Sequence, residues 1–354
     1  MAGEGPATVG VVVVSFCSQD VVLECLETLL ASEAVKLKIV VVDNASPDGT
    51  PDALQAWADG EVPYIHASQS PISPFTPAPK PLAMRVITAD DAVGELGQLT
   101  LIRSDANLGF AGGVNVGLRA LKGQVDWYWV LNPDCAVPPG TAAAFVAAAA
   151  DNPGFALMSS RTIYYDNPDR IQTDGGLIDR LTGSCRQEGY GAALSAALPE
   201  ASGLDWLTGA NLFVSPEFLK RAGPMTEDYF LYYEEVDWAF RRGDMPLALA
   251  PDAKVFHRGG TTIGTGSITR RPSPFANYFN HRNRIRFAQR HLARWPVGAY
   301  AYGVAKAGQV LLAGAADEAY AILAGVFDLP PPRSVARRFP DQRTARLALG
   351  RHAR

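Results

Sequence analysis

Residues 9–16, "VGVVVVSF", and residues 37–50, "LKIVVVDNASPDGT", each contain an almost unbroken run of apolar, mostly β-branched residues. Such runs are typical of strands that are buried on both faces of a parallel sheet. Between them, residues 18–32 carry polar starting residues and then apolar residues at helical spacing. A strand, a helix and a second strand in this order predict a β-α-β unit with parallel strands.

The same alternation continues downstream. Residues 50–58 predict a helix with Pro51 at its start, and residues 98–121 predict a strand, a glycine-rich turn and a helix. Residues 126–140 predict a further apolar strand that ends in Asn-Pro-Asp. Polar residues therefore follow successive strands at their carboxyl ends, which is where open α/β sheets bind ligands.

Size and composition indicate a globular protein. The chain has 354 residues, 47% of them hydrophobic, which suits one large α/β domain with an appendage or two ordinary domains. No apolar run is long enough to span a membrane and the N-terminus does not resemble a signal peptide, so we expect a cytoplasmic protein. The four cysteines lack CxxC or zinc-finger spacing, which predicts reduced thiols without a chemical role.

Charge is distributed unevenly along the chain. The net charge is −4, yet from Arg270 onward there are fourteen Arg and one Lys against four acidic residues. This basic segment favours an anionic partner, either a membrane surface or a phosphorylated acceptor, and a solvated helical face is the alternative. We expect no nucleic-acid partner, because the rest of the chain is acidic and carries no recognition module.

The domain organisation follows from these patterns. Residues 68–81, "SQSPISPFTPAPKP", are rich in Pro and Ser and predict a surface insertion, for which a flexible loop without function is the simpler interpretation. We therefore predict a catalytic domain over residues 1–268, with the Pro-rich insertion within 68–98. Residues 269–354 would form a basic, mainly helical C-terminal region.

The glycine-rich stretch does not match a dinucleotide or P-loop fingerprint. Gly109, Gly112, Gly113 and Gly117 do not form GxGxxG, and GxxxxGK[ST] is also missing, which disfavours a dehydrogenase. The glycines would let backbone amides and the side chains of Asn107 and Asn115 approach a diphosphate or sugar. Ordinary turn chemistry is the alternative.

Two acidic motifs are more specific. Asp134 follows an apolar strand, and a lone carboxylate there suits Mg²⁺ or Mn²⁺, although an ordinary Asp turn is the alternative. Residues 230–238, "FLYYEEVDW", place three carboxylates among aromatic residues. Burying charges in such surroundings is costly unless a partner compensates for it, so these acids have either a chemical or a helix-capping role.

Seven motifs in one order resemble the family 2 glycosyltransferases of GT-A fold. They are "VVVVSF", "VVVDNAS", "NLGFAGGVNVG", "VLNPDC", "LTGANLFV", "FLYYEEVDW" and "VFH". The similarity covers residues 9–290 and is greatest to the bacterial rhamnosyltransferase branch, which builds cell-wall linkers and surface polysaccharides. It implies a Rossmann-like mixed, mainly parallel sheet flanked by helices, with a C-terminal helical appendage. Two features depart from the family pattern: Asn132-Pro133-Asp134 replaces Asp-x-Asp, and the Pro-rich stretch has no counterpart.

The resemblance also implies a site, residue by residue. Asp43 matches the acid that binds the pyrimidine base or ribose, Asp134 matches the metal ligand, and His257 matches the His that completes the metal site or contacts the diphosphate. Further residues implied around the nucleotide sugar are Ser15, Phe16, Asn44, Ser46, Asp105, Asn107, Gly112, Asn115 and Asn132. Residues implied near the acceptor and donor sugar are Trp206, Thr208, Asn211, Arg282 and Asn283.

The implied reaction is an inverting displacement. Glu235 matches the catalytic base, and Glu234 or Asp237 would orient it or bind acceptor hydroxyls. The favoured donor is dTDP-L-rhamnose, with UDP-linked hexoses or galactofuranose as alternatives. The acceptor would be a lipid-diphosphate-linked glycan or a growing polysaccharide, at the inner face of the membrane. The other interpretation is a non-catalytic scaffold that binds nucleotide sugars.

Overall fold

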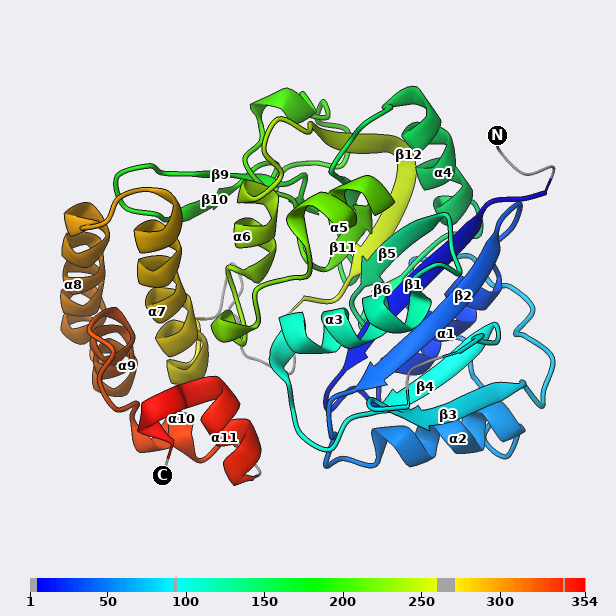
Figure 1. Cartoon of the computed structure of the whole chain (residues 1–354), viewed down its shortest axis with the longest axis horizontal. Coiled ribbons are helices and arrows are strands. Elements are labelled where there is room, and N and C mark those ends of the chain that lie inside the picture. Colours follow the sequence, from blue (N-terminus) through cyan, green and yellow to red (C-terminus); the bar gives the residue numbers. More distant parts are fainter. Residues whose placement is uncertain (1–4, 92–93, 260–270, 340, 354) are drawn as a thin grey trace.

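A computed structural model describes residues 5–91, 94–259, 271–339 and 341–353 (Figure 1). One large sheet has the strand order β3-β4-β2-β1-β5-β11-β7-β12-β6, and β8 pairs with β7. Its strands are β1 (Thr8–Ser15), β2 (Lys36–Asp43), β3 (Met84–Thr88), β4 (Leu99–Arg103), β5 (Trp127–Leu131), β6 (Cys135–Ala136), β7 (Leu157–Tyr164), β8 (Ile171–Thr173), β11 (Asn211–Val214) and β12 (Leu247–His257). β9 (Gly176–Ile178) and β10 (Cys185–Gln187) form a separate pair.

The sheet is mixed, as the family resemblance implies. β3, β4, β2, β1 and β5 run parallel to one another, and β12 is parallel to β7. β11 runs antiparallel to β5 and to β7, and β6 runs antiparallel to β12. The strands of the predicted β-α-β unit, β1 and β2, are adjacent and in register from Thr8 opposite Lys36 to Ser15 opposite Asp43.

Helices cover both faces of this sheet (Figure 1). They are α1 (Val22–Leu30), α2 (Thr50–Asp59), α3 (Gly109–Leu121), α4 (Thr141–Asp151), α5 (Pro216–Ala222) and α6 (Glu234–Phe240), besides those of the C-terminal region. Val11 and Val13 of β1 pack in the cluster that contains residues of α1, α2 and α4, whereas Val12 and Val14 pack in the cluster with α3. Apolar residues on both faces explain the unbroken valine run of β1.

The glycine-rich stretch serves helix–sheet packing. A Cβ on Gly117 would lie 2.4 Å from Cγ1 of Val12, and one on Gly113 would lie 2.6 Å from Cγ1 of Val14. Only glycine at these positions lets α3 approach β1 this closely. Asn115, on the same helix, is buried and donates to Met225 O at 2.9 Å and Glu227 Oε1 at 2.8 Å. These contacts replace the predicted approach of Asn115 to a diphosphate or sugar.

The Pro-rich stretch is anchored to the domain. Buried Glu27 accepts hydrogen bonds from Trp57 Nε1, Ala78 N and Lys80 Nζ at 2.7–2.9 Å. Residues 84–88, within the predicted insertion, form the edge strand β3. Its five residues are half-buried or exposed, so it lacks the apolar run that marks buried strands such as β1 and β2.

Helices make up most of the C-terminal region. They are α7 (Pro274–His291), α8 (Val297–Leu312), α9 (Ala316–Val326), α10 (Arg333–Ala336) and α11 (Gln342–Leu349). The predicted boundary between residues 268 and 269 lies outside the described residues. All four cysteines are free thiols, as expected. Among the described residues, every helix is too short or too polar to cross a bilayer.

Candidate active site

A cavity of about 1090 Å³ lies where several strands end. Phe16 follows β1, Asn44 follows β2, Asn132 and Asp134 follow β5, and His257 ends β12. The predicted site residues that line the cavity are Phe16, Asn44, Asn107, Asn132, Asp134, Trp206, Thr208, Glu234, Glu235 and His257. Those outside its lining are Ser15, Asp43, Ser46, Asp105, Gly112, Asn115, Asn211, Asp237, Arg282 and Asn283.

Buried polar atoms without partners gather at the ends of β1 and β2. Within the described part of the chain, Ser15 Oγ, Asp43 Oδ1 and Asn44 Oδ1 have no hydrogen-bond partner. Asp43 Oδ2 accepts from Ser46 N at 3.1 Å. Burial raises the pKa of Asp43, although the hydrogen bonds from Ser46 oppose this. Because buried polar atoms are normally satisfied, this edge of the sheet is suited to a polar ligand group.

Asp134 and His257 approach each other beside this edge. His257 Nε2 lies 3.1 Å from Asp134 Oδ1, and His257 Nδ1 lies 2.6 Å from Gln172 Oε1. If Nδ1–H donates to Gln172, the Nε2 lone pair can accept from Asn132 Nδ2 at 3.2 Å while it faces the Asp134 carboxylate, an arrangement that a cation between the two side chains would also stabilise. Burial would raise the pKa of Asp134, but the charge of His257 and its hydrogen bond bring the pKa below its ordinary value.

These two side chains fit a divalent cation. Ligand atoms of Asp134, Cys135 and His257 all lie within 4.8 Å of one another. Burial raises the pKa of the Cys135 thiol well above its usual range, and Cys135 Sγ faces Ala210 O at 3.6 Å, so the thiol is a poor ligand. A carboxylate and an imidazole remain, and they suit Mn²⁺ or Mg²⁺ when the donor supplies further oxygen ligands.

The acidic pair follows a strained loop. Phe230, Tyr232 and Tyr233 have φ of 66°, 69° and 74°, which side-chain-bearing residues rarely adopt. Glu234 and Glu235 come next, as the first residues of α6. Backbone strain of this kind persists only where surrounding contacts enforce it.

Arg282 and Asn283 of α7 provide those contacts. Asn283 Nδ2 donates to the carbonyls of Tyr229, Leu231 and Tyr232 at 2.6–3.0 Å. Arg282 Nη2 donates to Tyr229 O at 2.8 Å. Both side chains are buried outside the cavity lining. Both side chains therefore hold the backbone of residues 229–233, called the acidic loop below because it leads into Glu234 and Glu235. They lie away from their predicted position beside the sugar.

Glu234 and Glu235 differ in their surroundings although both line the cavity. Burial raises the pKa of Glu235 to about 7, against the lowering effect of the N–H groups of Glu235 and Val236. Burial, followed by the charge of Glu235, raises the pKa of Glu234 well above its ordinary value. With Glu234 protonated at neutral pH, Glu235 can ionise beside a neutral neighbour.

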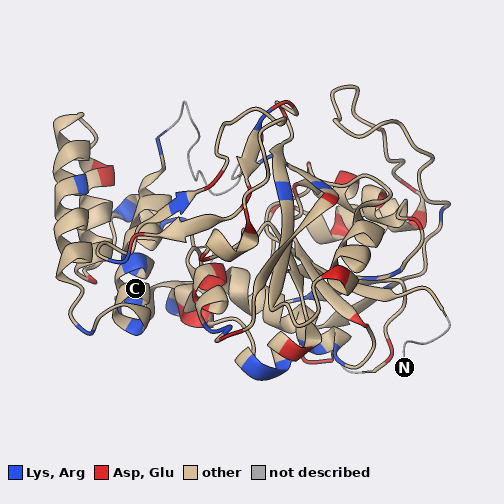
Figure 2. Cartoon of the chain, turned by 90° about the horizontal axis from the view of Figure 1, so that it is seen from above, with Lys and Arg blue, Asp and Glu red and all other residues tan. Residues whose placement is uncertain are grey.

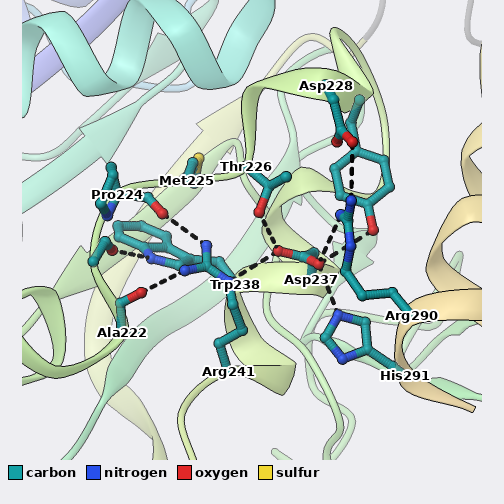
Figure 3. Close-up of polar contacts among 12 residues, drawn as sticks. Ala222, Pro224, Met225, Thr226, Asp228, Asp237, Trp238, Arg241, Arg290 and His291 are labelled. Atoms are coloured by element: carbon teal, nitrogen blue, oxygen red, sulfur yellow. Dashed lines mark hydrogen bonds and ion pairs between the residues drawn. The ribbon is translucent and has the colours of Figure 1, made fainter.

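Asp237 lies behind the cavity as the centre of a polar cluster (Figure 3). The hydrogen-bond donors around its fully buried carboxylate, at 2.6–3.4 Å, are Thr226, Tyr229, Arg241, Arg290 and His291. Burial opposes ionisation, but the hydrogen bonds from His291 and Thr226 and the charge of Arg241 hold the pKa of Asp237 far below its usual value. The structure thus places Asp237 where it joins α6 to α7, and not where it could contact an acceptor.

Other predicted residues also have internal partners. Asn211 lies fully buried in β11, where its Oδ1 accepts from Trp129 Nε1 and its Nδ2 donates to Ser160 Oγ, each at 2.9 Å. Asp105 is exposed and forms an ion pair with Arg343. Gly112 of α3 packs against Leu108, the residue just before that helix. All three positions lie outside the cavity lining.

Sequence reasoning also missed residues of the cavity. Gln172 contacts His257, and Arg258 pairs with Glu24 at 2.8 Å while lining the cavity. Arg258 directly follows a motif residue, which is a signal that could have identified it. Arg337 and Arg338 also line the cavity, and nothing in their local sequence marks them.

Comparison with known proteins identifies the family. The sequence profile described as "Glycosyl transferase family 2" matches residues 10–70 and 87–182, which include β1, β2, β5 and Asp134. This part of the chain is a family 2 glycosyltransferase domain. The resemblance seen in the ordered motifs is thereby confirmed.

Two curated relatives are named for succinoglycan biosynthesis and for L-rhamnosyl transfer. Succinoglycan biosynthesis protein ExoO of Rhizobium meliloti (strain 1021) is 27% identical over 241 residues, which is 68% of this chain but only 53% of ExoO. The chain thus spans about half the length of that relative. N-acetylglucosaminyl-diphospho-decaprenol L-rhamnosyltransferase of Mycobacterium tuberculosis (strain ATCC 25618 / H37Rv) is 25% identical over 76% of this chain and 82% of its own.

A solved structure supports the fold. The crystal structure of GalNAc-T7 with UDP, GalNAc and Mn²⁺ matches with a TM-score of 0.53 and 13% identity, over 87% of this chain and 52% of that chain. The predicted GT-A fold is confirmed by this likeness.

The hydrogen bonds that Asn283 donates to the acidic loop can be tested by measuring the stability of the protein. Asn283→Ala removes three hydrogen bonds to backbone carbonyls, so we expect the free energy of unfolding to fall by about 1–3 kcal/mol. The measurement is the unfolding midpoint in denaturant. Asn280→Ala, an exposed position on the same helix, is the control. Equal midpoints for the two variants would mean that Asn283 does not hold the loop.

Proposed function

We propose that this chain is an inverting, metal-dependent glycosyltransferase that acts in bacterial cell-surface glycan synthesis. The proposal rests chiefly on one observation: Asp134, His257 and Glu235 line the same cavity. A cation site and a carboxyl group with a pKa near neutrality are the two components that direct displacement at a sugar requires. A bound cation would neutralise charge on the departing nucleoside diphosphate.

The substrates are proposed from the relatives. The name of the mycobacterial relative favours L-rhamnose as the transferred sugar and a lipid-diphosphate-linked sugar as the acceptor. The donor would then be dTDP-L-rhamnose, and UDP-linked hexoses or galactofuranose are the alternatives. Polysaccharide acceptors are supported by the name of the Rhizobium relative.

The residues of the cavity have separate roles in this proposal. Asp134 and His257 would hold the cation, and Asn44, which lines the cavity and has an unpaired Oδ1, would contact the nucleoside. Ser15 and Asp43 lie directly behind it, outside the lining, and would need a shift of this edge to reach the nucleoside. Ionised Glu235 would take the proton of the acceptor hydroxyl as its oxygen bonds to the anomeric carbon. The bond from that carbon to the phosphate oxygen breaks at the same time, so the configuration inverts. Trp206 and Thr208 also line the cavity and would contact the sugars.

Replacement of the base tests the reaction directly. Glu235→Gln keeps the size of the side chain but cannot take a proton, so we expect turnover to fall about a hundredfold to ten-thousandfold while donor affinity survives. Turnover of the unchanged protein should rise as pH increases through about 7, because the base acts only when it is deprotonated.

Kinetics measures turnover and calorimetry measures donor affinity, each on the unchanged protein and on Glu235→Gln. Glu227→Gln is a matched control outside the cavity lining. Near-normal turnover by Glu235→Gln would show that another group accepts the proton. No sugar transfer by the unchanged protein with either donor class would favour the non-catalytic scaffold.

Replacement of the carboxylate tests the cation site. Asp134→Ala should abolish the Mn²⁺-dependent part of nucleoside diphosphate binding, whereas His257→Ala should reduce it less, because a neutral imidazole contributes less charge than a carboxylate. Calorimetric titration with and without Mn²⁺ measures the difference. Unchanged Mn²⁺ dependence in Asp134→Ala would contradict the assignment.

We also propose that the C-terminal region contacts an anionic membrane. Residues 271–316 contain six Arg, one Lys and no acidic residue. α8 lies at the outer end of the molecule, which is largely uncharged in Figure 2, and it exposes Val297, Val304, Leu311 and Leu312. Arg282 and Arg284 are buried, so the cations beside these apolar side chains are the exposed Arg294, just before α8, and the half-buried Lys306 of α8. Exposed apolar side chains with cations near them suit the interface of an anionic bilayer.

Vesicle binding tests this contact. Leu311 and Leu312 are 56% and 92% exposed, so changing both to Ser should weaken sedimentation with phosphatidylglycerol vesicles without unfolding the protein. Val62 and Ile65, exposed elsewhere, provide a matched control when both are changed to Ser. The proposal would be contradicted if the two double variants bound phosphatidylglycerol vesicles equally well. It would also be contradicted if the unchanged protein bound neutral phosphatidylcholine vesicles as strongly as phosphatidylglycerol vesicles.

A further inference from the structure

A β-hairpin forms the part of the cavity wall that is attached to the acidic loop. β9 and β10 pair antiparallel, and Gly183 lies in the turn between them. Gly183 O accepts a hydrogen bond from the hydroxyl of Tyr233, the last residue of the acidic loop, at 2.8 Å. Residues of β10 and of the turn after it line the cavity, namely Cys185, Arg186, Gln187 and Tyr190. The turn of the hairpin is therefore joined to the loop that leads into Glu235.

Trp206 fixes the other end of the hairpin. Its backbone O accepts from Gly176 N at 3.0 Å, and its backbone N donates to Gly176 O at 3.2 Å. A Cβ on Gly176 would lie 2.4 Å from Cζ2 of Trp206, so only glycine lets β9 lie this close to the indole. Three residues after Trp206, a Cβ on Gly209 would lie 3.5 Å from Cβ of Glu235. Both ends of the hairpin are thus joined to segments that contact or carry Glu235.

Two tyrosines meet where the hairpin approaches the candidate cation site. Tyr190 lies between Gly189 and Gly191, whose φ values are 73° and 72°, and it is 45% exposed although it lines the cavity. Its ring is edge to face with that of Tyr164, with ring centroids 6.3 Å apart. Tyr164 also lines the cavity, and in the pairing of β7 with β12 it lies opposite His257. The tyrosine pair is therefore next to the strand end that carries His257.

The order of the strands separates these tyrosines from the region proposed for the nucleoside. β1 and β2 lie on one side of β5, whereas β7 and β12 lie on its other side, beyond β11. Asp134 follows β5, so the candidate cation site lies between the ends of β1 and β2 and the two tyrosines. Because the diphosphate of a nucleotide sugar separates the nucleoside from the sugar, the region beyond the cation site suits sugar rings.

We propose that the β9–β10 hairpin and Tyr164 form a binding site for a sugar ring of the acceptor. A pyranose has an apolar face of C–H groups, which packs on the electron-rich face of an aromatic ring such as that of Tyr190. Gln187 supplies an amide that can donate to and accept from sugar hydroxyls. Ligand sites commonly combine aromatic surface with a few polar groups in this way.

The acceptor is assigned to this site, and not the donor sugar, because the hairpin is attached to the acidic loop. In the proposed function Glu235 must reach the hydroxyl of the acceptor, so the acceptor ring has to lie beside the segment that carries this side chain. The inference therefore rests on the proposed function and adds to it the residues that select the acceptor.

Calorimetry with two acceptor probes tests the site. The probes are N-acetylglucosamine linked through a diphosphate to a short isoprenyl chain, and a soluble oligosaccharide of β-linked glucose. Tyr190→Ala should weaken binding of at least one probe about tenfold, because the aromatic contact and its buried apolar surface are lost. Tyr190→Phe keeps the ring and should stay within about twofold. Neither variant should change the affinity for dTDP or UDP with Mn²⁺ by more than about twofold, because the nucleoside lies on the other side of the cation site.

Tyr320→Ala is the matched control. Tyr320 is 44% exposed on α9 and lies outside the cavity lining, so its replacement should leave the affinity for both probes unchanged. Equal affinities of Tyr190→Ala and Tyr320→Ala for both probes would overturn the acceptor site alone. A loss in Tyr190→Phe as large as that in Tyr190→Ala would do the same, and so would an equal loss of dTDP or UDP affinity in Tyr190→Ala.

The unchanged protein separates failure of this site from failure of the proposed function. If it bound dTDP or UDP with Mn²⁺ but neither acceptor probe, the acceptor site alone would be overturned. If it bound neither nucleotide, the proposed function would be overturned, and the acceptor site with it.

Discussion

The parallel pairing of β1 with β2 and with β5 is the constraint on which the site depends. In this register Ser15 lies opposite Asp43, and Val13 lies opposite Leu131. Because the three strands run in one direction, the segments that follow them leave the sheet at the same edge. The glycines of α3 let the covering helix lie close to β1 without disturbing that edge. The cavity is thus a consequence of strand direction before any side chain contributes to it.

Hydrogen-bond partners then decide what each buried carboxyl group can do. Glu235 and Asp237 are two positions apart on α6, yet the pKa of Glu235 is raised and that of Asp237 is lowered. Burial acts on both, but the donors around Asp237 include side chains from α7, from the residue after α6 and from a loop. One short helix can therefore present an acid to the cavity and use another as an anchor.

The C-terminal region is part of the site in three dimensions. Asn283 of α7 holds the carbonyls of the acidic loop, and His291 at the end of α7 contacts Asp237 at 2.7 Å. Thr344 and Phe339 attach the end of the chain to the cavity wall. The sequence separates a catalytic domain from a C-terminal appendage. In the structure, the appendage contacts and holds the strained loop of the catalytic domain that leads to Glu234 and Glu235.

The sequence by itself determined the buried strands, because a strand covered on both faces needs an unbroken apolar run, and the ordered motifs determined the family. β3 was missed because its edge position leaves its side chains partly exposed and removes that signal. Only the tertiary structure decided which motif residues face the cavity. Asn211 and Asn283 belong to recognisable motifs but bond to buried groups of the protein, since an amide satisfies a backbone carbonyl or a side chain as readily as a ligand. The partners that distinguish Asp237 from Glu235 include His291, 54 residues further along the chain, and such contacts leave no local pattern in the sequence.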